Sequence, residues 1–284
     1  MKNIKFLLIA ILALFGATSC SRTIDVLVIS GQTANGHNWE MMVSSLEEIY
    51  GDCDSFDVDF LLMCEQGESF NPIFEDYDVV VMTISVAQWS DEIKSRFEEY
   101  VSSGGGVVAV HEGASAFPEW REYNRMMGIN GWAGRDESNG PYYYWSEGEF
   151  VKDYTPGIAG KHGKRVPFDI NVRSENHPIM KGLPSVWTHY DDELYSLLRG
   201  EGENMEVLAT AFSQAETGGS GREEPVMMVV DYGKGRIFHT VLGHTQKNFT
   251  KAMNNKGFKV TLLRGTEWAA TGAVKQTSKL NLCK

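Results

Sequence analysis

Two histidines follow apolar runs of strand length. His111 comes directly after residues 107–110 in the stretch GGGVVAVHEGASAF (104–117), and His244 follows Gly243 just beyond the apolar run 235–242. Imidazole takes up and releases a proton near neutral pH, so two such side chains are suited to acid and base work. We predict His111 and His244 as catalytic residues.

The paired acids Asp192 and Glu193 stand immediately before a predicted strand that begins at Leu194. A carboxylate and an imidazole together supply two groups with separated pKa values, which acid and base chemistry needs. We predict Glu193 as a third catalytic residue, which orients an imidazole or a substrate hydroxyl group, and Asp192 as a substrate contact. The alternative, a solvated pair of acids, stays open at this point.

Other polar and aromatic side chains occur near the same predicted strand ends. His37 follows the turn sequence GQTANG (31–36), and Glu112 is the neighbour of His111. Trp132 and Trp187 offer aromatic faces for stacking on a ligand, although core packing explains such residues equally well. The predicted substrate contacts are therefore His37, Glu112, Trp132, Trp187 and Asp192.

A metal ion is an alternative use of these side chains. His37, His111, His244 and Glu193 carry groups that bind divalent ions, and ligands from separate loops can converge on one ion. The sequence has no HxH or HExxH pair, which would place two ligands on one element. We predict no cofactor and no metal ligand, and a divalent metal stays the alternative.

The bend AVHEGAS (109–115) has the pattern of a sharp turn from a strand into a helix. In such a turn residue 111 projects from the chain, and Gly113 permits close approach of another backbone segment. The alternative for His111 is a structural one, in which the ring ends the strand and bonds to the backbone. Ser115 lies one helical turn further on, but HEGAS does not match GxSxG.

Apolar runs of strand length alternate with segments of helical periodicity in the first part of the chain. These runs are residues 23–30, 55–63, 77–85 and 107–110. The alternation predicts an α/β domain, doubly wound, with a mostly parallel sheet covered on both faces. Ligands bind at the carboxyl ends of the strands in such domains, so Gly31, Ser85 and His111 lie at the predicted site.

The sequence GINGWAGRDESNGPYYYWSEGEF (128–150) begins a segment without periodicity that extends to about residue 176. We predict a loop-rich aromatic insertion with short strands, packed over the strand ends. Strand character returns at residues 205–212, 224–232 and 235–242, and a closing helix is predicted at residues 258–272.

The first residues have the pattern of an export signal. Lys2 and Lys5 precede an apolar run at 6–15, and small residues lead to Cys20. We predict a lipoprotein signal peptide at 1–19, lipidation of Cys20, a linker at 20–23, the domain at 24–272 and a tail at 273–284. The protein would then be exported and anchored by lipid in a bacterial cell envelope, on the periplasmic side. An ordinary secretory signal is the alternative.

The formal net charge of −12 disfavours nucleic acid as a partner, because an acidic surface repels phosphate. Beyond Cys20 there remain Cys53, Cys64 and Cys283, an odd number without CxxC spacing. This pattern is neither a disulfide framework nor a zinc motif. Whether Cys53 and Cys64 pair stays open, as does the oligomeric state.

Four segments together resemble the trehalose-utilisation (ThuA-like) family, of the class I glutamine-amidotransferase-like superfamily. They are GGGVVAVHEGASAF, HPIMKGLPSVWTHYDDELYSL (177–197), EPVMMVVDYGKGRIFHTVLGH (224–244) and LLRGTEWAATG (262–272). The resemblance implies a flavodoxin-like sheet. Amidotransferases of that superfamily have a cysteine where this chain has His111, and a histidine–x–glutamate pair where it has His244, Thr245 and Gln246. Glutamine hydrolysis is therefore not expected.

The resemblance also implies a function in carbohydrate catabolism. We expect an enzyme in which His111, His244 and Glu193 perform acid and base chemistry on a sugar or keto-sugar, giving isomerisation, elimination or glycosidic cleavage. The alternative is a non-catalytic sugar-binding or scaffold lipoprotein. Its stacking platform would be Trp132, the tyrosines at 142–144 and Trp187.

Overall fold

The computed structural model describes residues 22–34, 36–63, 70–85 and 87–282. The predicted signal peptide and Cys20 lie outside the described residues, as do Cys64 and Cys283. Within the described part of the chain, no helix combines the length and the apolar character needed to cross a membrane.

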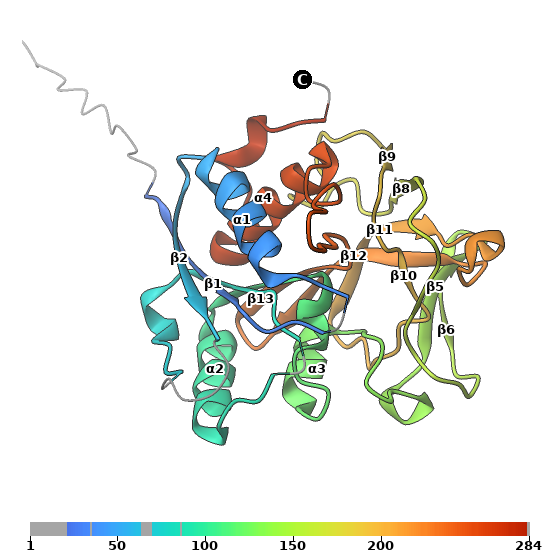
Figure 1. Ribbon diagram of the computed structural model, residues 1–284, viewed down its shortest axis with the longest axis horizontal. Helices are drawn as coiled ribbons and strands as arrows, with labels where there is room; N and C mark the ends of the chain where they lie inside the picture. Colours follow the sequence, from blue (N-terminus) through green and yellow to red (C-terminus); the bar gives the residue numbers. More distant parts are fainter. Residues whose placement is uncertain (1–21, 35, 64–69, 86, 283–284) are drawn as a thin grey trace, which may run out of the picture.

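A mixed sheet runs through the centre of the molecule, in the order β2-β1-β3-β4-β13-β12-β11-β8-β9 (Figure 1). Its first five strands pair in parallel. They are β1 (Ile24–Ser30), β2 (Phe56–Leu62), β3 (Val79–Met82), β4 (Gly106–Val110) and β13 (Gly235–Thr240). The predicted parallel strands are confirmed, and their carboxyl ends meet at one edge.

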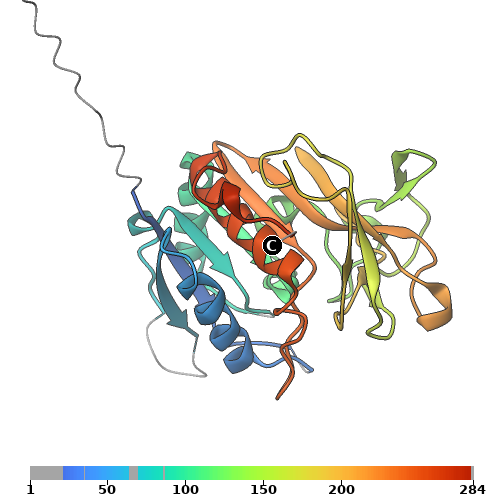
Figure 2. The same ribbon diagram turned by 90° about the horizontal axis from the view of Figure 1, so that it is seen from above.

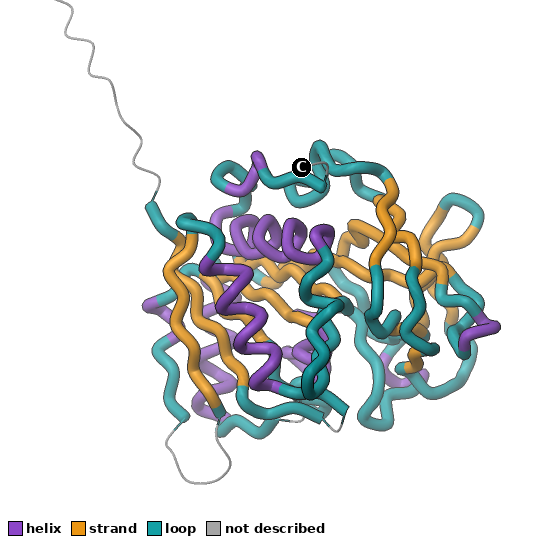
Figure 3. The backbone as a smooth tube through the Cα atoms, turned by 45° about the horizontal axis from the view of Figure 1, so that its top comes forward, coloured by secondary structure: helices purple, strands orange, loops and turns teal. Residues whose placement is uncertain are grey.

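The remaining strands of the path pair antiparallel. They are β12 (Glu223–Tyr232), β11 (Met205–Phe212), β8 (Phe168–Val172) and β9 (Val186–His189). The insertion also contains the hairpin β5 (Tyr142–Ser146) and β6 (Glu149–Asp153), and the short pair β7 (Lys161–His162) and β10 (Tyr195–Ser196). Figure 3 shows this region as strands and loops with only short helical pieces.

Helices cover both faces of the parallel strands, which confirms the doubly wound arrangement. One core cluster includes α1 (Trp39–Gly51) and α4 (Lys256–Thr271), which lie side by side in Figure 2. The other includes α2 (Asp91–Ser103) and α3 (Arg121–Met127). Ser90 caps α2 by accepting a hydrogen bond from the backbone of Ile93, as its position before two acids suggests.

The C-terminal tail is tied to α4. The buried carboxylate of Glu267 accepts hydrogen bonds from the backbone nitrogens of Lys275, Gln276 and Thr277 at 2.6–2.9 Å. A short 3₁₀ helix, Thr277–Lys279, follows. Residues 275–279 therefore pack on the domain instead of extending from it.

The buried carboxyl group of Glu224, in β12, makes the stability of the fold depend on pH. Its side chain is buried, and Oε1 accepts a hydrogen bond from the Ser220 hydroxyl at 2.6 Å. Burial raises the pKa of this carboxyl group to about 7. The folded pKa exceeds the unfolded one, so the protonated group adds stability at low pH, and this is lost as the pH rises through 7.

We expect Glu224→Gln to stabilise the protein at pH 8 by about 3 kcal/mol relative to the natural chain, and by less than about 1 kcal/mol at pH 5. Urea unfolding at the two pH values measures the difference. The exposed Glu216→Gln is the matched control and should show no such pH dependence. An equal effect of Glu224→Gln at both pH values would contradict the assignment.

Candidate functional site

The histidines that the sequence points to meet in one cluster. The Nε2 atom of His111 lies 3.1 Å from Nε2 of His37 and 3.2 Å from Nδ1 of His244. The Oε2 atom of Glu193 lies 3.3 Å from Nδ1 of His244 and 3.9 Å from Nε2 of His111. One potential ligand atom from each of the four side chains lies within 4.8 Å of all the others. These four residues are called the histidine cluster below.

The end of β4 places His111 in this cluster. His111 begins the 3₁₀ turn His111–Ser115 with a φ of 52°, in the left-handed region that few non-glycine residues adopt. Its Nδ1 atom lies 2.7 Å from the carbonyl oxygen of Val241, which can only accept, so Nδ1 carries the proton. The Nε2 lone pair therefore faces the cluster. A Cβ atom at Gly113 would overlap the carbonyl oxygen of Met82, which shows why this bend needs a glycine.

Asp192 positions the loop that carries His244. Its fully buried carboxylate accepts hydrogen bonds from Nε2 of His189 at 2.8 Å and from the backbone nitrogens of Gly243 at 2.8 Å and His244 at 3.1 Å. The backbone nitrogen of Glu193 donates to it as well, at 2.8 Å. Burial alone would raise the pKa of Asp192, but the hydrogen bond and charge of His189, with the other donors, lower it to about 2.

The prediction of Asp192 as a substrate contact is therefore corrected. Both carboxylate oxygens are enclosed and already accept hydrogen bonds from protein groups. This carboxylate acts on the site through the backbone that it holds.

His37 reaches the cluster from the loop after β1. Beneath it, the buried carboxyl group of Glu112 accepts hydrogen bonds from the Ser85 hydroxyl at 2.5 Å and from the backbone nitrogen of Ala34 at 3.0 Å. Its Oε2 atom lies 3.6 Å from Nδ1 of His37. Burial raises the pKa of Glu112 to about 7. Glu112 was predicted to contact substrate; instead, it joins the loops that follow β1 and β3 and is closed off by them.

The cluster opens toward solvent on the side of Glu193. The side chain of Glu193 is 13% exposed, and Nε2 of His162, on a side chain 42% exposed, lies 3.9 Å from its Oε2. The Tyr195 hydroxyl lies 2.7 Å from Nε2 of His111. Burial raises the pKa of Glu193 and also that of Tyr195, whose phenol is therefore protonated at neutral pH.

Burial also keeps the imidazoles neutral. It lowers the pKa of His111 to about 4 and that of His244 to about 3, and it lowers the pKa of His37. A neutral imidazole carries one lone pair that can accept a hydrogen bond or bind a metal ion. The cluster therefore offers several lone pairs in a small volume.

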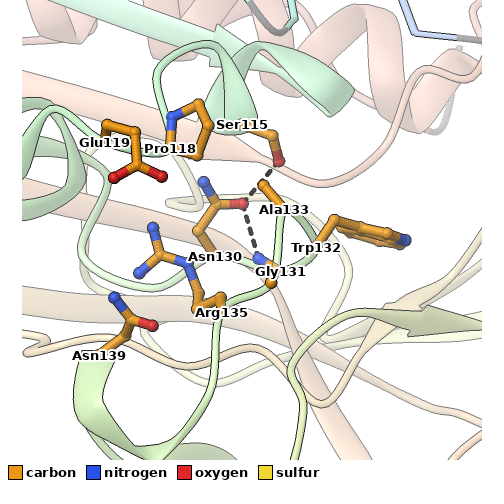
Figure 4. Close-up of a pocket in the computed structure, with 10 residues that line it drawn as sticks. Ser115, Pro118, Glu119, Asn130, Gly131, Trp132, Ala133, Arg135 and Asn139 are labelled. Atoms are coloured by element: carbon orange, nitrogen blue, oxygen red, sulfur yellow. Dashed lines mark hydrogen bonds between the residues drawn. The ribbon is translucent and has the colours of Figure 1, made fainter.

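A polar pocket is lined in part by Trp132, which is two ring contacts away from His111, and by no residue of the histidine cluster. The Trp132 ring lies 4.2 Å from the Tyr195 ring, which in turn lies 4.3 Å from the His111 ring. The pocket has a volume of about 120 Å³ (Figure 4) and is lined by residues that include Trp132, Arg135 and Asn139. An adjoining cavity of about 250 Å³ shares Arg135, Asn139, Pro118 and Glu119 with it.

The other aromatic side chains of the predicted stacking platform are already engaged. Trp187 packs against the core and against α4, where a Cβ atom at Gly257 would overlap its indole. The guanidinium of Arg199 lies 3.4 Å from the centre of the Tyr142 ring, and that of Arg222 lies 4.4 Å from the centre of the Tyr144 ring. The indole of Trp187 thus contributes to packing, and its substrate contact stays a prediction.

Comparison with known proteins agrees with this architecture. A family model described as trehalose utilisation, ThuA, matches residues 25–269. The chain belongs to the ThuA family. The crystal structure of a ThuA-like protein from Parabacteroides merdae matches this chain with a TM-score of 0.85. The two sequences are 46% identical, and the match covers 89% of this chain and 92% of that one. A ThuA-like protein from Bacteroides uniformis is 16% identical, with a TM-score of 0.59 over 90% and 95% of the two chains, and shares the fold.

Membership of the ThuA family supports a carbohydrate-related role for the chain. A search of curated proteins found no match. The reaction proposed for this chain therefore rests on the geometry of its own site.

Three residues of this ThuA site were missed by the sequence analysis: Tyr195, His162 and His189. Tyr195 follows Glu193 by two positions, and side chains two apart in an extended segment point to the same face, so the sequence did contain a signal for it. His162 reaches Glu193 only because β7 pairs with β10, with His162 opposite Tyr195. No local pattern in the sequence predicts that pairing.

Proposed function

We propose that this ThuA-family protein is an enzyme that moves protons on a sugar or keto-sugar, leading to isomerisation, elimination or glycosidic cleavage. The observation that carries the proposal is the position of Glu193. Its Oε2 atom lies within 3.3–3.9 Å of the rings of His244, His111 and His162, on the side of the cluster that solvent reaches. A carboxylate held in this way is suited to accept a proton from a bound ligand.

Glu193 takes the proton-accepting role in this proposal, whereas the buried Tyr195 hydroxyl donates its hydrogen bond to Nε2 of His111. His111 and His244 were predicted for this work. Both are only 1% exposed, and both ring nitrogens of His111 already face protein atoms. We assign these two imidazoles to hold the reacting groups in place.

The pocket beside Trp132 supports a sugar as the ligand. Sugar hydroxyls need both donors and acceptors, and Arg135 donates while the carboxylate of Glu119 accepts. The Trp132 indole borders the pocket, and its ring also packs against Tyr195 and Gly160. The two adjoining cavities, of about 120 and 250 Å³, together fall within the range of small-ligand sites, about 300–1,000 Å³.

The test is to incubate the protein with keto-disaccharides and with plain disaccharides, and to follow binding and product by NMR. Glu193→Gln preserves the shape of the side chain but cannot take up the proton, so we expect turnover to fall by about 100-fold or more. Glu149→Gln, on the exposed side of the β5–β6 hairpin, is the matched control and should keep full turnover.

Two results would contradict the proposal. Glu193→Gln with unchanged turnover would remove the base from the mechanism. Binding of sugars by the natural protein without any product would favour the non-catalytic sugar-binding lipoprotein instead.

A further inference from the structure

We infer that His37, His111 and His244 form a binding site for one divalent transition-metal ion, zinc in the first place. The three ligand atoms are Nε2 of His37, Nε2 of His111 and Nδ1 of His244, and Glu193 lies at the open side. The position of the ion follows from the geometry of the ligand atoms, whereas its role in catalysis rests on the proposed function.

More ring nitrogens converge at the centre of the cluster than hydrogen bonds can pair. Nε2 of His111 has one lone pair, because its Nδ1 proton is given to Val241. Three atoms nevertheless surround this nitrogen: the Tyr195 hydroxyl at 2.7 Å, Nε2 of His37 at 3.1 Å and Nδ1 of His244 at 3.2 Å. A single lone pair accepts the tyrosine proton and leaves the other two nitrogens without a bond to it. A cation between the rings would bind the lone pairs of all three nitrogens at once, and the Tyr195 hydroxyl would then donate to another acceptor.

The spacing of the nitrogens fits a small tetrahedral ion. Zinc binds imidazole nitrogen at about 2.0–2.1 Å, so ligand atoms at tetrahedral angles stand roughly 3.3 Å apart. The measured separations from Nε2 of His111 are 3.1 and 3.2 Å, and the Glu193 oxygen lies 3.3 Å from Nδ1 of His244. Catalytic zinc sites commonly have three protein ligands and one open position. The histidine cluster has this composition, with its opening at Glu193.

One of the three rings is held as ligand-bearing histidines are usually held. Metal-binding imidazoles almost always donate their other N–H group to a carbonyl or a carboxylate. His111 donates to the carbonyl oxygen of Val241, and Nδ1 of His37 faces the carboxyl group of Glu112 at 3.6 Å. His244 is held through its backbone nitrogen by Asp192. Among the described residues, the outer ring nitrogens of His37 and His244 have no hydrogen-bond partner, so only the His111 ring is fixed in this way.

The charges near the cluster favour a cation. Asp192 and Glu193 stand close to the three neutral rings, while the charge of Arg165 acts on Glu193 and His244 in the opposite sense. Imidazole ligands favour zinc and its transition-metal neighbours, whereas magnesium and calcium prefer oxygen. When bound, such an ion polarises a sugar oxygen and makes neighbouring protons more acidic. Glu193 is placed to receive one of these protons.

The test measures metal binding directly, with ZnCl₂ and with CoCl₂ as an optical probe. The full chain is stripped with a chelator, dialysed, and titrated by calorimetry and visible spectroscopy. We expect one equivalent of Zn²⁺ to bind, and one equivalent of Co²⁺ to give the absorption of a low-coordinate site. His37→Ala and His244→Ala should each lower the affinity by at least about 10-fold. His37 lies at the rim, so its loss is compatible with folding, which circular dichroism checks.

His162→Ala is the matched control, because this histidine faces Glu193 but not the three ligand nitrogens, and it should bind Zn²⁺ as the natural chain does. Glu193→Gln separates the two proposals: it should lose turnover while still binding the ion. A chain that binds no Zn²⁺, or whose affinity is the same in folded His37→Ala and His244→Ala, would overturn the metal site. Metal binding without sugar turnover would instead overturn only the proposed function.

Discussion

Asp192→Asn should destabilise the protein by about 2–6 kcal/mol, since two buried donors would lose their acceptor at about 1–3 kcal/mol each. Four donors point at the two oxygens of Asp192, from His189 and from the backbone of Glu193, Gly243 and His244. An amide replaces one oxygen by a donor, so two of the four donors then face an NH₂ group in either orientation. The released loop carries His244, and we expect sugar turnover and metal affinity to fall with stability. Urea unfolding measures stability, NMR measures sugar turnover, and Zn²⁺ titration measures metal affinity.

The neighbouring Asp191 supplies the control. Its side chain is 42% exposed and pairs with Lys251 at 3.4 Å. Asparagine tolerates its left-handed φ of 55°, so Asp191→Asn should change stability by less than about 0.5 kcal/mol. If Asp192→Asn behaves like Asp191→Asn, the buried carboxylate does not hold the site.

Gly113→Ala should have an effect of similar size for a steric reason. The added methyl group would overlap the carbonyl oxygen of Met82, which is backbone and cannot turn aside as a side chain does. We expect a loss of about 3 kcal/mol, at the upper end of the usual cost of overpacking. We also expect a displaced turn at His111, two residues away. Thermal unfolding and Zn²⁺ titration report the two consequences separately.

Gly51→Ala is the comparison for this substitution. Gly51 ends α1 without positive φ, and a Cβ atom there would meet nothing within 4 Å. Alanine at such a position is neutral or stabilising by up to about 1 kcal/mol. Equal stabilities for the two variants would show that the strand β3 can move away from the turn at little cost.

The meeting of His111, His244 and His37 follows from rules that act on the sequence. Each residue comes after a strand of the parallel group, and carboxyl ends of parallel strands share one edge. The predicted substrate contacts were wrong for residues whose role depends on burial. Asp192 and Glu112 are as polar as any substrate contact, and only the packing of the loops after β1, β3 and β13 shows that they are enclosed.

The sequence also could not predict contacts that depend on distant strand pairing. His162 and Tyr195 meet through two strands of two residues each, which are too short to leave a pattern of alternation. Trp187 packs on α4 because β9 lies beside β8 at the far edge of the antiparallel part. The apolar runs of the parallel strands are long enough to be recognised, whereas these short elements are formed by the tertiary structure.

The position of β13 has a consequence for biosynthesis. This strand lies between β4 and β12, in the interior of the sheet, although it comes late in the chain, at Gly235–Thr240. A ribosome must release most of the polypeptide before the gap can close, and until then β4 and β12 expose free edges on which other chains can pair. Nascent chains should therefore depend on chaperones up to this point, and the three histidines can come together only once the last strand is inserted.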